Sequence, residues 1–298
     1  MPKKQKNNKV TAVEDSVIMG PDGEPMMIMP PNFDFTTAIQ VWQGAPKTGK
    51  TSTASALGTV AKRLGIPGIR PFFLIFEPGT GGVDIEGTSR KCECKGKDKS
   101  CSVCGGLGVV RLVLDVDVDP QDPLKTVNTW FEWVVTTAYN PIVIDTADAM
   151  HRVLSDGVCM KMGISGPHKS DHGIAWSELF NEWREKLSIL VNSGKGVILL
   201  SHLYYQEKKL RGGATMQSAT FNIGGKSKPY LEGLANQIIH FEVVPSADVD
   251  KHIISTRRTA GIEAGDHWGV YPDELDRGQS SEEGAEAILR CWYEVSDK

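Results

Sequence analysis

The stretch Gly44-Ala45-Pro46-Lys47-Thr48-Gly49-Lys50-Thr51 decides the fold, since it matches G-x-x-x-x-G-K-[ST] at every fixed position. The apolar residues 38–42 predict a strand before it, and residues 52–64 predict a helix after it. In that setting the glycines let backbone N–H groups curl around phosphate oxygens, and the helix N-terminus favours the bound anion. The sequence therefore predicts a phosphate-binding loop between a strand and a helix.

The residues of this loop have separate expected tasks. We expect Lys50 to reach the β- and γ-phosphates and the Thr51 hydroxyl to take one position on Mg²⁺. The expected nucleotide contacts are Gly44, Ala45, Pro46, Lys47, Thr48, Gly49, Lys50, Thr51 and Ser52. ATP and Mg²⁺ are thus the expected cofactors.

The bulk properties exclude several classes of protein. The chain has 298 residues, of which 40% are hydrophobic and 23% are charged, as in an ordinary globular protein. A formal net charge of -4 argues against coating nucleic acid through bulk charge, although a local basic site remains compatible with it. No apolar run reaches the ~18 residues of a membrane span, and no apolar segment of a secretory signal follows the basic start. We therefore expect a cytoplasmic protein without a membrane partner.

Continuous apolar segments alternate with amphipathic ones over residues 35–275. This alternation is typical of a mostly parallel sheet with helices on both faces, so the expected fold class is α/β. The expected strands are residues 72–76, 109–116, 141–144, 197–200, 237–244 and 252–257, and the expected helices are residues 123–139, 176–191 and 282–292.

Three regions stand apart from this expected core. Residues 1–34 are polar and basic and then broken by prolines, so we expect a flexible tail. Residues 276–298 hold the last helix and a C-terminal tail. Residues 206–228 are polar, basic and Gly-rich, which is typical of a mobile loop.

Three titratable residues come directly after expected strands, namely Glu77, Asp145 and, beside Ser201, His202. The carboxyl ends of parallel strands form the sheet edge where ligands bind. We expect Asp145 to hold Mg²⁺ through water, paired with Thr51, although it could instead cap the following helix. Glu77 could orient the attacking water and accept its proton, or be a loop surface glutamate. His202 could touch the γ-phosphate or be a structural histidine.

Residues 90–108 form a Cys-, Gly- and Lys-rich insert in this pattern. Cys92, Cys94, Cys101 and Cys104 are spaced C-x-C-x₆-C-x₂-C, so four thiolates could close a tetrahedron around structural Zn²⁺. The segment is too short and polar to bury a core, so metal would supply its folding energy. Disulfides are the alternative, which a reducing compartment disfavours. The surrounding lysines, Lys91, Lys95, Lys97 and Lys99, could meet phosphates or form a solvated face.

The segment after His202 has the composition of a single-strand binder. Tyr204 and Tyr205 could stack on bases, while Lys208, Lys209 and Arg211 could pair with the backbone. The alternative is a lid with ordinary charges. Given the phosphate loop, we expect DNA contact here.

The order of these motifs resembles the RecA-like ATPase core, and more closely the small phage RecA-like proteins of the Sak single-strand-annealing group. The resemblance covers residues 35–272 and implies a RecA-like P-loop NTPase core, here with the zinc knuckle inserted. It implies that Glu77 is the catalytic glutamate, Asp145 the Walker-B aspartate and His202 the sensor. A histidine at the sensor position and the cysteine insert differ from bacterial RecA.

The resemblance also implies partners. The loop after His202 would be the mobile DNA-binding loop, and Arg257 and Arg258 fall where such proteins place cations that reach a neighbouring subunit's nucleotide. We therefore expect a homo-oligomer, as a ring or filament, that acts on single-stranded DNA in phage recombination or replication, in the host cytoplasm and with a phage single-strand-binding protein as a further candidate partner. A helicase or packaging motor is one alternative. A nucleotide-gated scaffold with a protein-binding zinc knuckle is another.

Overall fold

The computed structural model describes residues 18–19, 25–26, 34–77, 89–91, 97, 109–111, 113–116, 118–209, 213, 215–259 and 261–293. The chain divides into two units, residues 1–32 and 33–298. Within the first unit, strand β1 (Ile18–Met19) pairs antiparallel with β2 (Pro25–Met26). The sequence had predicted only a tail there.

The second unit is built on one large sheet with the strand order β14-β12-β11-β3-β9-β8-β4-β7. From β11 to β7 every neighbouring pair is parallel, which confirms the predicted α/β class. These six strands are β11 (Gln237–Val244), β3 (Ile39–Gly44), β9 (Val197–Lys209), β8 (Ile142–Asp145), β4 (Phe72–Ile75) and β7 (Val113–Asp115). Strands β12 (Lys251–Ser255), β13 (Gly265–Asp266) and β14 (Glu274–Asp276) extend the sheet with antiparallel pairs.

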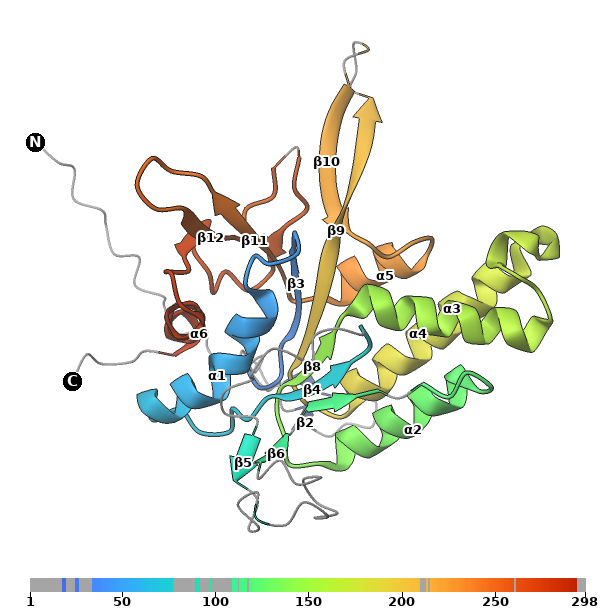
Figure 1. Ribbon diagram of the computed structural model, residues 1–298, viewed down its shortest axis with the longest axis horizontal. Coiled ribbons are helices and arrows are strands. Elements are labelled where there is room, and N and C mark those ends of the chain that lie inside the picture. Colours follow the sequence, from blue (N-terminus) through green and yellow to red (C-terminus); the bar gives the residue numbers. More distant parts are fainter. Residues whose placement is uncertain are drawn as a thin grey trace, which may run out of the picture. The chain divides into compact units, whose positions relative to one another are not determined.

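Helices cover both faces of this sheet because its strands are apolar on both sides (Figure 1). Ile142 and Ile144 point into the core that the sheet shares with α2 (Pro123–Thr136), α3 (Ala147–Met162), α4 (Ile174–Asn192) and α5 (Ser227–Leu234). Val143, between them, points into the opposite core, which is built with α1 (Lys50–Leu64) and α6 (Ser281–Trp292). The last helix is therefore part of the α/β unit. None of the helices in the described ranges is long and apolar enough to cross a membrane.

The predicted strand 109–116 is two strands in different sheets. Strand β6 (Val109–Arg111) pairs antiparallel with β5 (Ser89–Lys91), whereas β7 lies at the edge of the main sheet beside β4. An apolar run predicts extended backbone but carries no information about which neighbour it pairs with. The β5–β6 pair brings Lys91 opposite Val109, so it holds the two ends of the cysteine insert together.

The predicted loop 206–228 is also different, because residues 206–209 and 215–221 lie in a β-hairpin and residues 227–228 begin α5. Strand β9 continues past the sheet to Lys209 and pairs antiparallel with β10 (Thr215–Phe221), from Leu203 opposite Phe221 to Lys209 opposite Thr215. The hairpin projects beyond the other strands (Figure 1). Cross-strand hydrogen bonds satisfy the backbone of this ribbon. Its buried residues, Ser218, Ala219, Thr220 and Phe221, are half polar, so the sequence lacks the apolar alternation that predicts a strand.

Candidate functional site

The phosphate loop joins the end of β3 to the start of α1, and two glycines are required by its geometry. A Cβ at Gly44 would lie 2.5 Å from the carbonyl oxygen of Phe241, so only glycine fits beside β11. Gly49, the residue before α1, has φ 92°, in the left-handed region that favours glycine. The strand, loop and helix predicted from the sequence are thus confirmed.

Lys50 is held at the mouth of this loop. Its ammonium donates to the carbonyl oxygens of Gly44 at 2.8 Å and Ala45 at 3.0 Å, and its side chain is buried. Burial lowers the pKa of Lys50 to about 8, and nearby carboxylates oppose that shift. Anionic phosphates would favour the charged form and replace the carbonyls as partners.

Asp145 lies at the carboxyl end of β8, beside the start of α1. Its Oδ2 accepts a hydrogen bond from the Thr51 hydroxyl at 2.9 Å. Burial raises the pKa of Asp145 to about 6, against the opposing effect of the Thr51 hydrogen bond. A hydroxyl and a carboxylate side by side are oxygen ligands that suit Mg²⁺, so the residues present fit the expected metal.

Asp145 does not cap the helix that follows. Thr146 is the N-cap of α3, and its hydroxyl accepts a hydrogen bond from the backbone N–H of Ala149 at 3.3 Å. The carboxylate of Asp145 therefore remains available to Thr51 and a metal ion, and the alternative role that the sequence left open is wrong.

His202 and Glu77 meet at the same edge of the sheet. Gly44 is opposite His202 in the β3–β9 ladder, and the backbone N–H of Phe76 donates to the carbonyl of Asp145 at 2.7 Å. The His202 Nδ1 lies 3.7 Å from Glu77 Oε2. The structure therefore brings Glu77, Asp145 and His202 together beside the phosphate loop.

Asp148 completes this group and was not predicted. The backbone N–H of His202 donates to Asp148 Oδ1 at 3.1 Å, and His202 Nδ1 lies 3.4 Å from Asp148 Oδ2. The hydrogen bond with Asp148 raises the pKa of His202 against the effect of burial. For Asp148 itself, burial raises the pKa, but the hydrogen bonds from His202 outweigh it and lower the pKa overall. A D-x-x-D spacing from Asp145 was the available signal, but an acid in a first helical turn is common for other reasons.

Arg257 and Arg258 are not brought to this group. They follow β12, and both are exposed. Arg257 is 68% exposed, with its Nη1 3.8 Å from Asp273 Oδ2. Their expected role concerns a neighbouring subunit's nucleotide, so it stays a prediction.

The four cysteines predicted to bind zinc, Cys92, Cys94, Cys101 and Cys104, lie outside the described residues. Arg211 also lies outside them. Within the described ranges there is no cluster of three or more His, Cys, Asp or Glu side chains suited to a metal ion.

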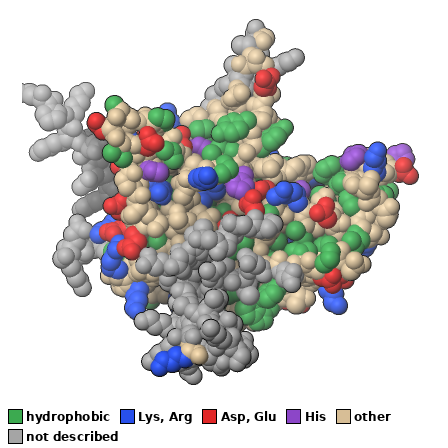
Figure 2. Space-filling view, viewed as in Figure 1, with side chains coloured by type: hydrophobic (Ala, Val, Ile, Leu, Met, Phe, Trp, Pro, Cys, Tyr) green, Lys and Arg blue, Asp and Glu red, His purple; other side chains and the backbone are tan. Residues whose placement is uncertain are grey.

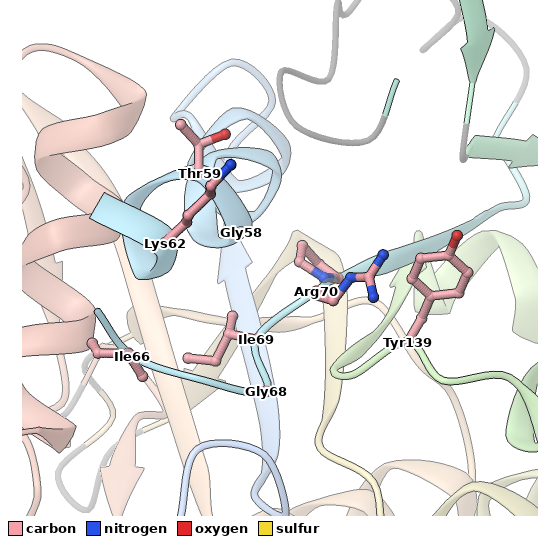
Figure 3. A pocket seen from close by; sticks show the side chains of 9 residues that line it. Gly58, Thr59, Lys62, Ile66, Gly68, Ile69, Arg70 and Tyr139 are labelled. Atoms are coloured by element: carbon pink, nitrogen blue, oxygen red, sulfur yellow. The ribbon is translucent and has the colours of Figure 1, made fainter. Parts of the chain in front are cut away.

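A cavity of about 480 Å³ lies where α1 passes into β4, at the amino edge of the parallel strands (Figure 3). In it the guanidinium carbon of Arg70 lies 5.4 Å from the centre of the Tyr139 ring. The phosphate loop is at the carboxyl edge of the same strands, so this cavity is separate from the site above.

Comparison with known proteins identifies one matching family. A family model described as AAA domain, AAA_24, matches residues 37–268, which include the phosphate loop and the Glu77, Asp145 and His202 positions. Among solved structures, the chain is similar to a KaiC-like protein from the hyperthermophilic archaea Pyrococcus horikoshii OT3. That similarity has 15% sequence identity and a TM-score of 0.42, and it covers 90% of this chain and 94% of that one. No curated protein matches the chain.

Proposed function

This chain belongs to the AAA_24 family of AAA domains, and from that premise we propose that it hydrolyses ATP with Mg²⁺ while bound to single-stranded DNA. The family, the phosphate loop and the parallel sheet make it a RecA-like P-loop ATPase. We further propose which residues carry out hydrolysis, that the protein binds DNA, and in which biological process it acts.

One observation carries the catalytic part. The Thr51–Asp145 hydrogen bond of 2.9 Å and the Glu77–His202–Asp148 group lie beside the same loop. The Thr51–Asp145 pair, which suits Mg²⁺, therefore lies next to the Glu77 carboxylate, which can act on water. Phosphoryl transfer to water requires both a metal ion and a group that orients the water.

The side chains then have distinct tasks. Lys50 binds the β- and γ-phosphates, and the Thr51 hydroxyl and the Asp145 carboxylate hold the metal ion. Mg²⁺, when bound, neutralises charge on the phosphates. The Glu77 side chain is 33% exposed, so its carboxylate can reach a water molecule, orient it and accept its proton. Asp148 positions His202, whose ring can donate toward the γ-phosphate.

The hairpin supports DNA as the partner. Tyr204 and Tyr205 on β9 are 54% and 57% exposed, which is unusual for tyrosines that serve only in packing. Figure 2 shows hydrophobic side chains exposed over the lower part of the projecting hairpin. Lys208 and Lys209 follow on the same strand, so aromatic faces and cations share one ribbon, as single-strand binding needs.

The motif order and the proposed DNA partner support a role in single-strand annealing during phage recombination or replication, within an oligomer. Arg257 and Arg258 are exposed beyond β12 and free of the loop in their own chain, which suits contact with a neighbouring subunit's nucleotide. We propose that one of them completes that neighbour's site. Strand-displacement activity would instead indicate a motor.

Structural zinc in the cysteine insert is part of the proposal. The support is the C-x-C-x₆-C-x₂-C spacing and the β5–β6 pair, which closes the ends of the segment. Elemental analysis of freshly purified, reduced protein should find about one zinc per chain. Metal-free protein would contradict this part alone.

The function is tested by phosphate release from ATP in the unmodified protein and in Lys50→Ala, each with and without a single-stranded oligonucleotide. We expect Mg²⁺-dependent turnover that the oligonucleotide stimulates, and almost none in Lys50→Ala because the phosphates lose their main cation. Equal turnover in both proteins would refute the phosphate-loop assignment. A protein that binds ATP but never turns it over would indicate a nucleotide-gated scaffold.

A further inference from the structure

Arg277 places a second cation at the phosphate loop, from the opposite side to the catalytic group. It follows β14, which is antiparallel to β12, which in turn is antiparallel to β11. Strand β14 therefore runs in the same direction as β3, and Arg277 emerges at the edge where the loop lies. From the sequence alone, this residue belongs only to the C-terminal region 276–298.

The guanidinium of Arg277 lies directly against the loop. A Cβ added to Gly49 would come within 2.7 Å of the Arg277 Cζ. Nη1 lies 3.5 Å from the Thr53 hydroxyl, one turn into α1, and a Cβ at Gly284 of α6 would lie 2.6 Å from the Arg277 Cγ. The side chain is thus wedged between the start of α1 and α6, with its charged end at the loop.

This cation is buried and poorly paired. Arg277 is 5% exposed, and its Nε is buried without a hydrogen-bond partner. No carboxylate among the described residues lies within ion-pair distance of it, and burial lowers its pKa although Glu283 opposes that effect. Burying a charge without a partner is unfavourable. Elsewhere the α1–α6 contact consists of buried apolar residues, among them Ala285, Ile288 and Leu289, and of the ion pairs that Arg63 makes with carboxylates of α6. Packing alone therefore does not explain a buried arginine here.

The strand order indicates which part of a nucleotide it would meet. Strand β3 lies between β9, β8 and β4 on one side and β11, β12 and β14 on the other. Glu77, Asp145 and His202 come from the first side, where the γ-phosphate and water are handled. Arg277 comes from the second side, which contributes none of the residues assigned to the γ-phosphate and water.

We propose that Arg277 binds the α- and β-phosphate portion of the nucleotide, the part that ATP and ADP share. The inference rests on the proposed function, because it requires a nucleotide at this loop. A guanidinium offers several donors in a fixed plane to phosphate oxygens, and the bound anion supplies the partner that the buried charge lacks.

The test compares Arg277→Gln with Arg63→Gln, by calorimetric titration with ATP and ADP and by melting without nucleotide. Arg63 is a matched control because it also joins α1 to α6, through Glu282 and Glu286, at the end of α1 remote from the loop. We expect Arg277→Gln to raise the Kd of ATP and ADP by the same factor, ~10- to 100-fold, with no loss of melting temperature. Arg63→Gln should leave both Kd values unchanged.

Three results would overturn the inference. The first is a folded Arg277→Gln variant with unchanged Kd values. The second is a variant that loses affinity for ATP but not for ADP. The third is an equal loss of affinity in both variants, accompanied by a lower melting temperature in both. If Arg277→Gln does not fold, the same titrations are made with Arg277→Lys, which keeps the charge but loses the planar arrangement of donors. Unchanged Kd values in Arg277→Lys would also overturn the inference. An unmodified protein that binds neither nucleotide would refute the proposed function as well, whereas normal binding with an unaffected Arg277→Gln refutes this inference alone.

Discussion

Asp148 holds His202 through two contacts, one from its backbone N–H at 3.1 Å and one from its ring Nδ1 at 3.4 Å. The two contacts fix both the backbone of β9 at His202 and the orientation of the imidazole. Because β9 continues from His202 into the hairpin, this relationship links the phosphate loop to the proposed DNA-binding ribbon.

Replacing Asp148 with Asn should loosen that link. The amide oxygen can still accept from the backbone, but the anion that raises the pKa of His202 is gone, so that pKa should fall. We expect turnover to drop by about 10- to 100-fold, as when other positioning side chains are lost. Histidine NMR titration and phosphate release check both effects. Asp171→Asn, at an exposed turn, is the control. An unmoved His202 pKa would show that Asp148 does not act through the ring.

Asp145→Asn should stabilise the nucleotide-free protein at neutral pH. The folded-state pKa of Asp145 is raised from 3.8 to about 6, so the folded protein holds this proton more tightly than the unfolded chain. Stability is therefore lost as pH rises from about 4 to about 6, and the loss is at most about 3 kcal/mol above that window. The variant removes the penalty but also a metal ligand. Melting at pH 4 and pH 8 should show a gain only at pH 8, and an equal gain at both would contradict the assignment.

The hairpin should bind DNA both by stacking of its tyrosines on bases and by charge pairing of its cations with phosphates, and the two contributions can be measured separately. Tyr204→Ser with Tyr205→Ser should weaken oligonucleotide binding about tenfold or more without changing its salt dependence, because stacking is uncharged. Lys208→Gln, Lys209→Gln and Arg211→Gln together should flatten the salt slope, because fewer counterions are released. Fluorescence titration at several salt concentrations measures both, with Lys125→Gln and Lys161→Gln on α2 and α3 as controls. Unchanged affinity and slope in both hairpin variants would move DNA contact elsewhere.

The sequence predicted what depends on local pattern. The phosphate loop has a fixed motif, and Asp145 and His202 follow apolar runs that predict buried strands without ambiguity. Asp148 was missed because an acid in the first turn of a helix has a common explanation, its favourable interaction with the helix dipole. Arg277 was missed because only the pairing of β14 with β12 brings it to Gly49, far away in the sequence. The hairpin could not be predicted because its strands are held by cross-strand pairing and show no apolar alternation.

The most direct test of the catalytic account is phosphate release by Glu77→Gln beside the unmodified protein, with Mg²⁺ and single-stranded DNA present. The substitution keeps the shape of Glu77 but removes the carboxylate that would take the proton of the attacking water. Glu132→Gln, on the exposed face of α2, is the control. The account predicts unchanged ATP affinity with turnover reduced by a factor on the order of 10² or more in Glu77→Gln alone. Turnover equal to that of the unmodified protein would contradict it and assign the water to another group.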